Sequence, residues 1–219
     1  MSELTLVIGN RNYSSWSLRP WILLRHLGLP FREIRLALDT PEFEASVARY
    51  SPTRRVPVLL DGAVTVWEST AILEYASELA GGAGWPAERA ARAAARAVSA
   101  EMHAGFAALR SAYPMNIRAR GRRVASTPAL EAAVARIDAL WSGCRERFGD
   151  RGPWLFGDYS AADAMYLPVA FRFQTYAPAG LGTHAREYLA TAVSDPLVQS
   201  WVQAAEAETE TIAHDEAGL

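Results

Sequence analysis

Residues 56–69 read VPVLLDGAVTVWES, and this stretch decides the fold of the chain. Two short apolar runs flank the Asp-Gly pair at 61–62, which is a strong β-hairpin signal because tight hairpin turns favour these residues. Pro57 has no N–H to donate, so we expect it at the start of the first strand. Apolar residues then recur at helical spacing over 71–79. The stretch therefore predicts a hairpin whose second strand leads into a helix at positions 68–69.

The junction at Glu68 and Ser69 is a candidate binding site. Backbone N–H groups at a helix start are unpaired and carry partial positive charge, which suits an anion. Glu68 could hold an ammonium group, while Ser69 and its amide could hold a carboxylate, so the pair could bind a zwitterion. The alternative is that Ser69 is only an N-cap and that Glu68 is solvated.

The first third of the chain alternates strands and helices. The pattern predicts a strand over Leu4–Ile8, a helix over 17–27, a second strand over 33–38 and a short helix after Thr40-Pro41. Pro20 is expected in the first turn of the first helix, where its missing N–H has no partner. Because a helix joins them, the first two strands should be parallel, whereas the hairpin strands are antiparallel.

The second part of the chain has an all-helical pattern. The glycine-rich segment 81–84 is a predicted linker between a domain over 1–80 and a helical domain over 86–219. One helix is expected over 86–113 and a second over 128–148, after the cap residue Thr127. A third should begin at the capping box of Ser160 and Asp163 and bend at Pro168, and a last one should follow Asp195-Pro196. The acidic residues 206–216 are expected to fray.

Composition excludes several classes of function. The chain has 219 residues and a formal net charge of -2, so nothing indicates a nucleic acid or an anionic membrane as partner. Its basic residues are all arginine, and Cys144 is the only cysteine, which excludes an intrachain disulfide and fits a reducing cytosol. No apolar run reaches transmembrane length and the N-terminus lacks a signal-peptide pattern. We expect a cytoplasmic protein without a metal site.

A serine-rich loop lies between the first strand and the first helix. Ser14, Ser15 and Ser17 precede Arg19 there. The carboxyl ends of parallel strands are where open α/β folds bind ligands, and a hydroxyl beside a helix start can donate a hydrogen bond to an anion. Ordinary N-capping by one of these serines is the alternative.

Four motifs together resemble the cytosolic glutathione S-transferases. They are Ser14-Ser15-x-Ser17-x-Arg19, Ser51-Pro52-x-x-x-Val56-Pro57-x-Leu59, Glu68-Ser69-x-Ala71-Ile72 and Gly157-x-x-Ser160-x-x-Asp163. The first is similar to the serine motif of the zeta-like classes, and the segment from Glu101 to Arg118 looks like that of a bacterial branch. The resemblance implies an α/β thioredoxin-like N-terminal domain, an all-α C-terminal domain, a homodimer, and glutathione as co-substrate.

The resemblance also implies roles for individual residues. Ser14 is expected to activate the glutathione thiol, with Ser15 as the second candidate. Val56 should pair its backbone with the cysteinyl part of glutathione, with Pro57 in the cis form. Arg55 stands where relatives often have glutamine, and it either reaches the glycyl carboxylate or is solvated.

By the same resemblance, Glu68 and Ser69 should hold the γ-glutamyl group. The electrophile is expected between the domains. The residues expected around it are Tyr13, Trp16, Phe106, Tyr113 and Met115, with His103 and Asn116 nearby. A basic run over 118–123 is either a solvated turn or a means of attracting an anionic substrate.

The function implied is transfer of glutathione to small electrophiles. A glutathione-dependent isomerase of the maleylacetoacetate type is an alternative, although Trp16 replaces the cysteine of that motif and Pro20 follows the arginine. A non-catalytic glutathione-fold binding module is a second alternative. The serine loop has no cysteine, which argues against a cycle through a glutathione–enzyme disulfide; Cys144 is expected in the core.

Overall fold

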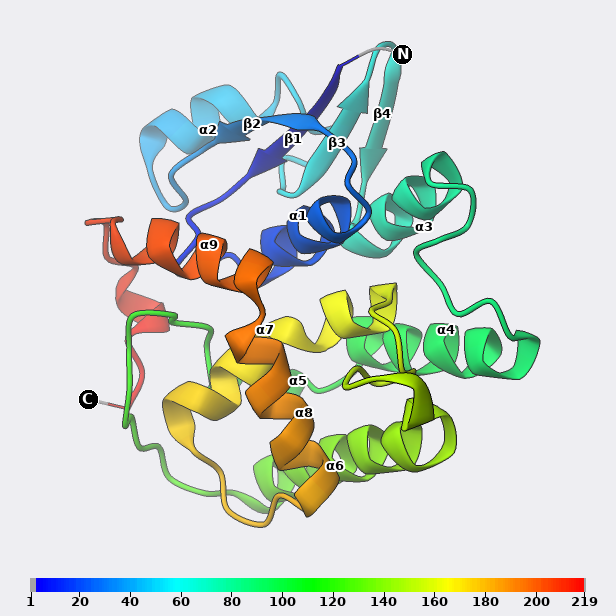
Figure 1. Ribbon diagram of the computed structural model, residues 1–219. Helices are drawn as coiled ribbons and strands as arrows, with labels where there is room; N and C mark the ends of the chain where they lie inside the picture. The colour runs from blue at the N-terminus through cyan, green and yellow to red at the C-terminus, as the bar shows by residue number, and fades with distance from the viewer. Residues whose placement is uncertain (1–2, 219) are drawn as a thin grey trace.

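The computed structural model describes residues 3–218, and its N-terminal part is built on a four-stranded sheet (Figure 1). The strands are β1 (Leu4–Ile8), β2 (Phe31–Arg35), β3 (Val58–Asp61) and β4 (Val64–Trp67). Their order is β2-β1-β3-β4, with β1 parallel to β2 and β3 antiparallel to both neighbours. The predicted strand directions are confirmed.

The second strand begins and ends earlier than predicted. It pairs residue for residue with β1, from Leu4 opposite Phe31 to Ile8 opposite Arg35. Beyond this point the chain leaves the sheet, and the Leu38 N–H donates to Asn10 Oδ1 at 2.7 Å. The end of β2 is therefore set by the length of its partner strand β1, and not by the alternation of apolar and polar residues over 33–38.

The hairpin forms as the Asp-Gly signal predicts. Val58 pairs with Trp67 and Asp61 with Val64, and Gly62 occupies the turn with a φ of 57°. Pro57 immediately precedes β3, and the Val56–Pro57 peptide bond is cis.

Three helices accompany the sheet: α1 (Ser15–His26), α2 (Pro41–Val47) and α3 (Ser69–Leu79). Thr40 caps α2, because its hydroxyl accepts from the Phe43 N–H at 3.1 Å. Helix α1 begins two residues before the predicted start, so Pro20 lies inside it and not in its first turn. The Ser14 N–H donates to Asn10 O at 2.8 Å, and this turn directs the chain into the helix early.

The C-terminal part is all-helical. Its helices are α4 (Arg89–Ala104), α5 (Ala107–Ala112), α6 (Pro128–Phe148), α7 (Ala161–Tyr176), α8 (Thr183–Ser194) and α9 (Pro196–Glu206), with short 3-10 turns η1 (Gly149–Arg151) and η2 (Ala213–Asp215). The prediction of one helix over 86–113 is wrong, because the chain breaks at Gly105 and Phe106 takes a left-handed φ of 60°. Helix α8 was not predicted at all.

Local caps explain where most of these helices begin. Thr127 Oγ1 accepts from the Leu130 N–H at 3.2 Å, and Asp195 Oδ1 accepts from Leu197 N at 2.9 Å. Ser160 and Asp163 form the expected capping box at the start of α7. These caps confirm the predicted starts of α6, α7 and α9.

Helix α7 is the centre of the core. Fifteen of its residues are buried, Pro168 among them, and it packs against α1, α4 and α8. Figure 1 shows α1 and α3 between the sheet and the C-terminal helices, so α1 contacts both parts of the chain. Cys144 lies in this core, as expected, and burial raises the pKa of its thiol to about 12.

The acidic C-terminal segment does not fray, contrary to the prediction. Glu208 accepts hydrogen bonds from the backbone N–H groups of Arg11 and Asn12, at 2.8 Å and 3.0 Å. Glu216 accepts from Tyr13 Oη and from Arg122, both at 2.7 Å. The carboxylates fix this segment because they meet donors of the serine-rich loop and of the arginine run.

No helix within residues 3–218 is long and apolar enough to cross a bilayer.

Candidate functional site

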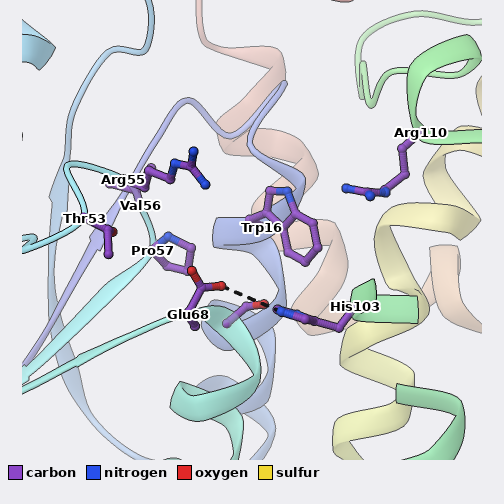
Figure 2. A pocket seen from close by; sticks show the side chains of 9 residues that line it. Trp16, Thr53, Arg55, Val56, Pro57, Glu68, His103 and Arg110 are labelled. Atoms are coloured by element: carbon purple, nitrogen blue, oxygen red, sulfur yellow. Dashed lines mark ion pairs between the residues drawn. The ribbon is translucent and has the colours of Figure 1, made fainter. Parts of the chain in front are cut away.

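A cavity of about 240 Å³ lies where the sheet domain meets the helical part of the chain. Its lining residues are Trp16, Thr53, Arg55, Val56, Pro57, Glu68, Ser69, His103 and Arg110, and Figure 2 shows these side chains around it. All five residues predicted to bind glutathione are among them. The described residues contain no cluster of His, Cys, Asp and Glu that could hold a metal ion.

One wall of the cavity is the segment before β3. The Arg55 N–H donates to Ser51 Oγ at 3.1 Å, which fixes the backbone just before Val56. The Arg55 side chain is exposed, and none of the carboxylates within residues 3–218 forms an ion pair with it. Pro57 is buried beneath this wall.

Ser69 is the first residue of α3 and lines the cavity floor. Only 1% of its surface is exposed, and its Oγ has no hydrogen-bond partner among the described residues. The alternative that Ser69 is the N-cap is wrong, because Glu68 occupies that position without capping through its side chain. A buried hydroxyl without a partner costs about 1–3 kcal/mol, so this atom is available to a bound group.

Glu68 adopts a strained backbone conformation at the same junction. Its φ is 68°, a region that costs a residue with a Cβ about 1–2 kcal/mol. The side chain is 54% exposed, and its Oε2 lies 3.8 Å from His103 Nε2. His103 is held in turn by Thr70, whose Oγ1 lies 2.8 Å from its Nδ1.

The opposite wall is centred on the indole of Trp16. His103 contacts the ring edge-on at a centroid distance of 5.4 Å. The guanidinium carbons of Arg19 and Arg110 lie 4.0 Å and 5.5 Å from the ring centroid. Trp16 therefore joins the sheet domain to α4 and α5 at the mouth of the cavity.

The two predicted catalytic serines immediately precede Trp16 in the chain. Ser14 Oγ donates to Ser17 Oγ at 2.7 Å, and Ser17 Oγ accepts from the Gly9 N–H at 3.1 Å. Ser14 and Ser15 are both buried, and neither is among the residues lining the cavity. Their catalytic roles stay predictions.

Two buried asparagines position the serine-rich loop, and sequence reasoning missed them. Asn10 O accepts from the Ser14 N–H, and Asn12 Oδ1 accepts from the Arg118 N–H at 2.8 Å. Asn12 Nδ2 also donates to Asn116 Oδ1 at 3.0 Å. Both residues stand in an apparently ordinary polar loop, and only tertiary contacts reveal their role.

Of the residues expected around or near the electrophile, Trp16 and His103 line the cavity, and the others do not. Tyr13 donates to Glu216, and Tyr113 stacks on Tyr176 at a centroid distance of 4.4 Å. Met115 is 1% exposed in the core, and Phe106 packs against the core at the start of α5.

The basic run over 118–123 is occupied by contacts within the chain. Arg118 donates to Tyr13 Oη and to the carbonyl oxygens of Glu208 and Glu210, while Arg122 pairs with Glu216. Neither of these arginines lines the cavity, and Arg120 donates only to nearby carbonyls.

Thr53 and Arg110 line the cavity although neither was predicted. Arg110 lies on the six-residue helix α5, within a stretch predicted as one continuous helix. The break at Gly105 turns α5 toward Trp16, and no local sequence signal indicates that turn.

Two family models match the chain. One, described as the N-terminal domain of glutathione S-transferase, matches residues 13–79, and the other, for the C-terminal domain, matches residues 127–204. The chain belongs to the glutathione S-transferase family. Its fold is accordingly a thioredoxin-like domain followed by the all-helical domain of this family, which confirms the predicted fold class.

Curated relatives match over short segments. A dichloromethane dehalogenase of Methylorubrum extorquens is 42% identical over 60 residues, which are 26% of this chain and 21% of the relative. Another, from Methylophilus leisingeri, is 52% identical over 40 residues, which are 18% of this chain and 14% of the relative. The chain thus matches no more than about a fifth of the length of either relative.

Solved structures match over nearly the whole chain. A glutathione transferase homologue from Burkholderia GL BGR1, crystallised with bound glutathione, has a TM-score of 0.71 and 25% identity. That comparison covers 94% of this chain and 100% of the other. A Tau class glutathione S-transferase from mango has a TM-score of 0.70 at 17% identity, covers 93% and 96% of the two chains, and shows the fold alone.

Proposed function

We propose that the protein is a glutathione transferase that binds glutathione in the cavity between Val56 and Ser69. The observation that carries the proposal is the buried, unpartnered hydroxyl of Ser69 beside the carboxylate of Glu68. A hydroxyl at a helix start suits a carboxylate, and Glu68 suits an ammonium group. The α-amino acid end of a γ-glutamyl group carries both.

The remaining parts of glutathione follow the wall formed by residues 55–57. The Val56 backbone pairs with the cysteinyl unit. Arg55 is exposed and lines the cavity without a carboxylate partner in the described chain, which supports a contact with the glycyl carboxylate. A guanidinium group fits a carboxylate through paired N–H donors.

Ser14 is the proposed activator of the thiol, as in the serine-type, zeta-like branch that its motif resembles. A free thiol has a pKa near 8.5, so only a few per cent of it is ionised at neutral pH. A hydrogen bond from Ser14, together with the start of α1, favours the thiolate. For this the hydroxyl must turn away from Ser17 Oγ, to which it donates at 2.7 Å; Ser15 is the second candidate.

The proposed electrophile has a halogen on carbon, as the two dehalogenase relatives suggest. The thiol loses its proton to solvent, and the thiolate sulfur forms a bond to carbon. The carbon–halogen bond breaks and its electron pair leaves with the halide. Exclusion of water around the sulfur strengthens each of these electrostatic effects.

A homodimer is part of the proposal. The exposed large apolar residues of the described chain are Val64 and Trp67 on β4 and Leu79 on α3. Because β4 and α3 contact each other, the exposed apolar side chains of Trp67 and Leu79 support a protein interface on that side of the molecule. Sedimentation of the wild type and of Trp67→Arg would compare their masses, and a monomeric wild type would reject the dimer.

Titration calorimetry and steady-state kinetics test the main proposal. We expect glutathione to bind and to react with 1-chloro-2,4-dinitrobenzene or with dichloromethane, followed as conjugate or released chloride. Turnover of maleylacetoacetate alone would favour the isomerase. Tight binding with no turnover of any of these would favour the binding module, and an absence of binding would reject all three.

A further inference from the structure

Three arginines form a cluster at the Trp16 wall: two contact the indole, and the third interacts electrostatically with those two. They are Arg19 on α1, Arg110 on α5 and Arg172 on α7. No carboxylate within residues 3–218 forms an ion pair with any of them, although other arginines of the chain are paired. Unpaired buried charge is costly, so a cluster of three cations needs a reason.

Two of the three arginines have structural roles. Arg19 is fully buried and donates through Nε to Met165 O at 3.0 Å, and Arg172 donates through Nε to Tyr113 O at 2.7 Å. Burial and the neighbouring cations lower the pKa of both arginines, and that of Arg172 falls to about 10. The charge of Asp215 acts in the opposite direction on the pKa of Arg172. Each still leaves one guanidinium nitrogen without a partner.

Arg110 differs from both because it lines the cavity. Its guanidinium group makes no hydrogen bond within the described chain, and its Nε is buried without a partner. Figure 2 shows its side chain directed toward Trp16, on the side away from Arg55 and Glu68. Its only described attractive contact is with the Trp16 ring, 5.5 Å from the guanidinium carbon.

We infer that Arg110 binds a carboxylate on the electrophilic substrate, beside the Trp16 ring and facing the glutathione sulfur. This inference rests on the proposed transferase function and names the class of substrate, a small anionic electrophile. The fork of guanidinium donors suits a carboxylate, and the fixed charges of Arg19 and Arg172 raise the local positive potential.

The other charges at the cavity are compatible with this assignment. Glu68 is the one acidic residue among those lining the cavity. His103 Nε2 lies 3.8 Å from its carboxylate, and the ammonium of glutathione would neutralise the charge of Glu68. The carboxylates of glutathione itself are assigned to Ser69 and Arg55, so Arg110 is left for a second molecule.

A matched pair of aromatic chlorides tests the inference. 4-Chloro-3,5-dinitrobenzoate carries a carboxylate, whereas 1-chloro-2,4-dinitrobenzene does not, and both lose chloride to the thiolate. In Arg110→Gln we expect kcat/KM for the benzoate to fall about 10- to 100-fold, with little change for the neutral substrate. In Arg110→Lys, which keeps the positive charge, kcat/KM for the benzoate should fall less than in Arg110→Gln. Arg120→Gln removes an exposed arginine outside the cavity, and it should leave kcat/KM unchanged for both substrates.

Calorimetry separates this inference from the proposed function. 3,5-Dinitrobenzoate, which cannot react, should bind the wild type and bind Arg110→Gln more weakly, while the Kd for glutathione is equal in both. Equal losses for both chlorides, or a weaker affinity for glutathione in the variant, would mean that Arg110 serves glutathione and would overturn the inference. Unchanged benzoate binding would overturn it as well. A chain that binds benzoate through Arg110 but not glutathione would instead reject the transferase.

Discussion

At the scale of single residues, the site is marked by groups whose bonding is incomplete. Ser69 has a buried hydroxyl without a partner, Glu68 holds a left-handed backbone, and the Arg110 guanidinium group makes no hydrogen bond within residues 3–218. Each of these features costs free energy in the folded chain. A bound tripeptide and an anionic substrate would offset those costs, so these residues are where substitutions should affect binding more than folding.

Ser69→Ala should weaken glutathione binding without weakening the fold. Removing the hydroxyl deletes a donor to the γ-glutamyl carboxylate, which is worth about 1.5–3 kcal/mol, or about 10- to 100-fold in Kd. It also removes an unsatisfied buried group, so the free energy of unfolding should stay the same or rise slightly. Titration calorimetry and urea unfolding measure the two quantities.

Ser99 offers a matched control for that experiment. It is 1% exposed on α4, its Oγ likewise lacks a partner, and it does not line the cavity. Ser99→Ala should leave the glutathione Kd unchanged. If both alanine variants weakened binding equally, the assignment of Ser69 to the ligand would fail.

Ser14→Ala should raise the pKa of the bound glutathione thiol toward its free value near 8.5. The hydroxyl is proposed to stabilise the thiolate, and its loss leaves the helix start alone to do so. Thiolate absorbance of the enzyme–glutathione complex against pH measures the shift, with Ser15→Ala as the comparison. A shift in Ser15→Ala and none in Ser14→Ala would transfer the role to Ser15.

At the scale of secondary structure, the elements that begin with a local cap were predicted from sequence. Thr40, Thr127 and Asp195 each accept a backbone N–H at the expected helix start. The break at Gly105 and the whole of α8 were not predicted. The N-cap of α8 is Gly182, which has no side chain to cap the helix, so the start of α8 has no local signal.

The capping box of α7 predicts a particular pH dependence. Asp163 accepts from Leu155 N at 3.0 Å and from Ser160 N at 2.8 Å, so Asp163→Asn should cost about 2–4 kcal/mol of stability. Burial raises the pKa of Asp163 from 3.8 to about 6. Between these values the folded chain keeps a proton that the unfolded chain releases, so the contribution of this group declines as the pH rises.

Urea unfolding of the wild type and of Asp163→Asn from pH 4 to pH 7 measures this effect. Asparagine does not titrate, so the advantage of the wild type should shrink as the pH rises toward 6 and then level off. An advantage that grows with pH would mean that the hydrogen bonds to the carboxylate outweigh its burial.

At the scale of the whole molecule, every residue predicted for one wall of the cavity lines it, whereas only Trp16 and His103 of those predicted for the opposite wall do so. The segments at 55–57 and 68–69 are local motifs, and all of their predicted residues line the cavity. The other wall depends on how α5 packs against Trp16, which has no sequence period. The arginine run was ambiguous for the same reason, because its partners lie on the segment over 208–216.

Glu208→Gln should loosen the serine-rich loop from a distance. Its carboxylate accepts from the backbone N–H groups of Arg11 and Asn12. In the glutamine variant the side-chain NH₂ group, itself a donor, would face one of these two N–H groups, and that hydrogen bond would be lost. We expect a loss of about 2–3 kcal/mol and an increase of about 10-fold or more in hydrogen exchange of those two amides. Glu206→Gln changes the same charge at an exposed position and should do neither. Unaltered hydrogen exchange in Glu208→Gln would mean that the serine-rich loop is stable without the Glu208 carboxylate.

The bond between Arg11 and Glu208 joins residues 197 positions apart. During synthesis at about 5–20 residues per second, the loop that carries Ser14 therefore waits roughly 10–40 s before the ribosome supplies the carboxylate that fastens it. All four strands of the β-sheet are synthesised in the meantime, but the loop between β1 and α1 cannot reach its final hydrogen bonding until translation has reached this segment. A nascent chain stalled upstream of it would lack the carboxylate that accepts from the Arg11 and Asn12 amides, so its serine-rich loop would stay unfastened.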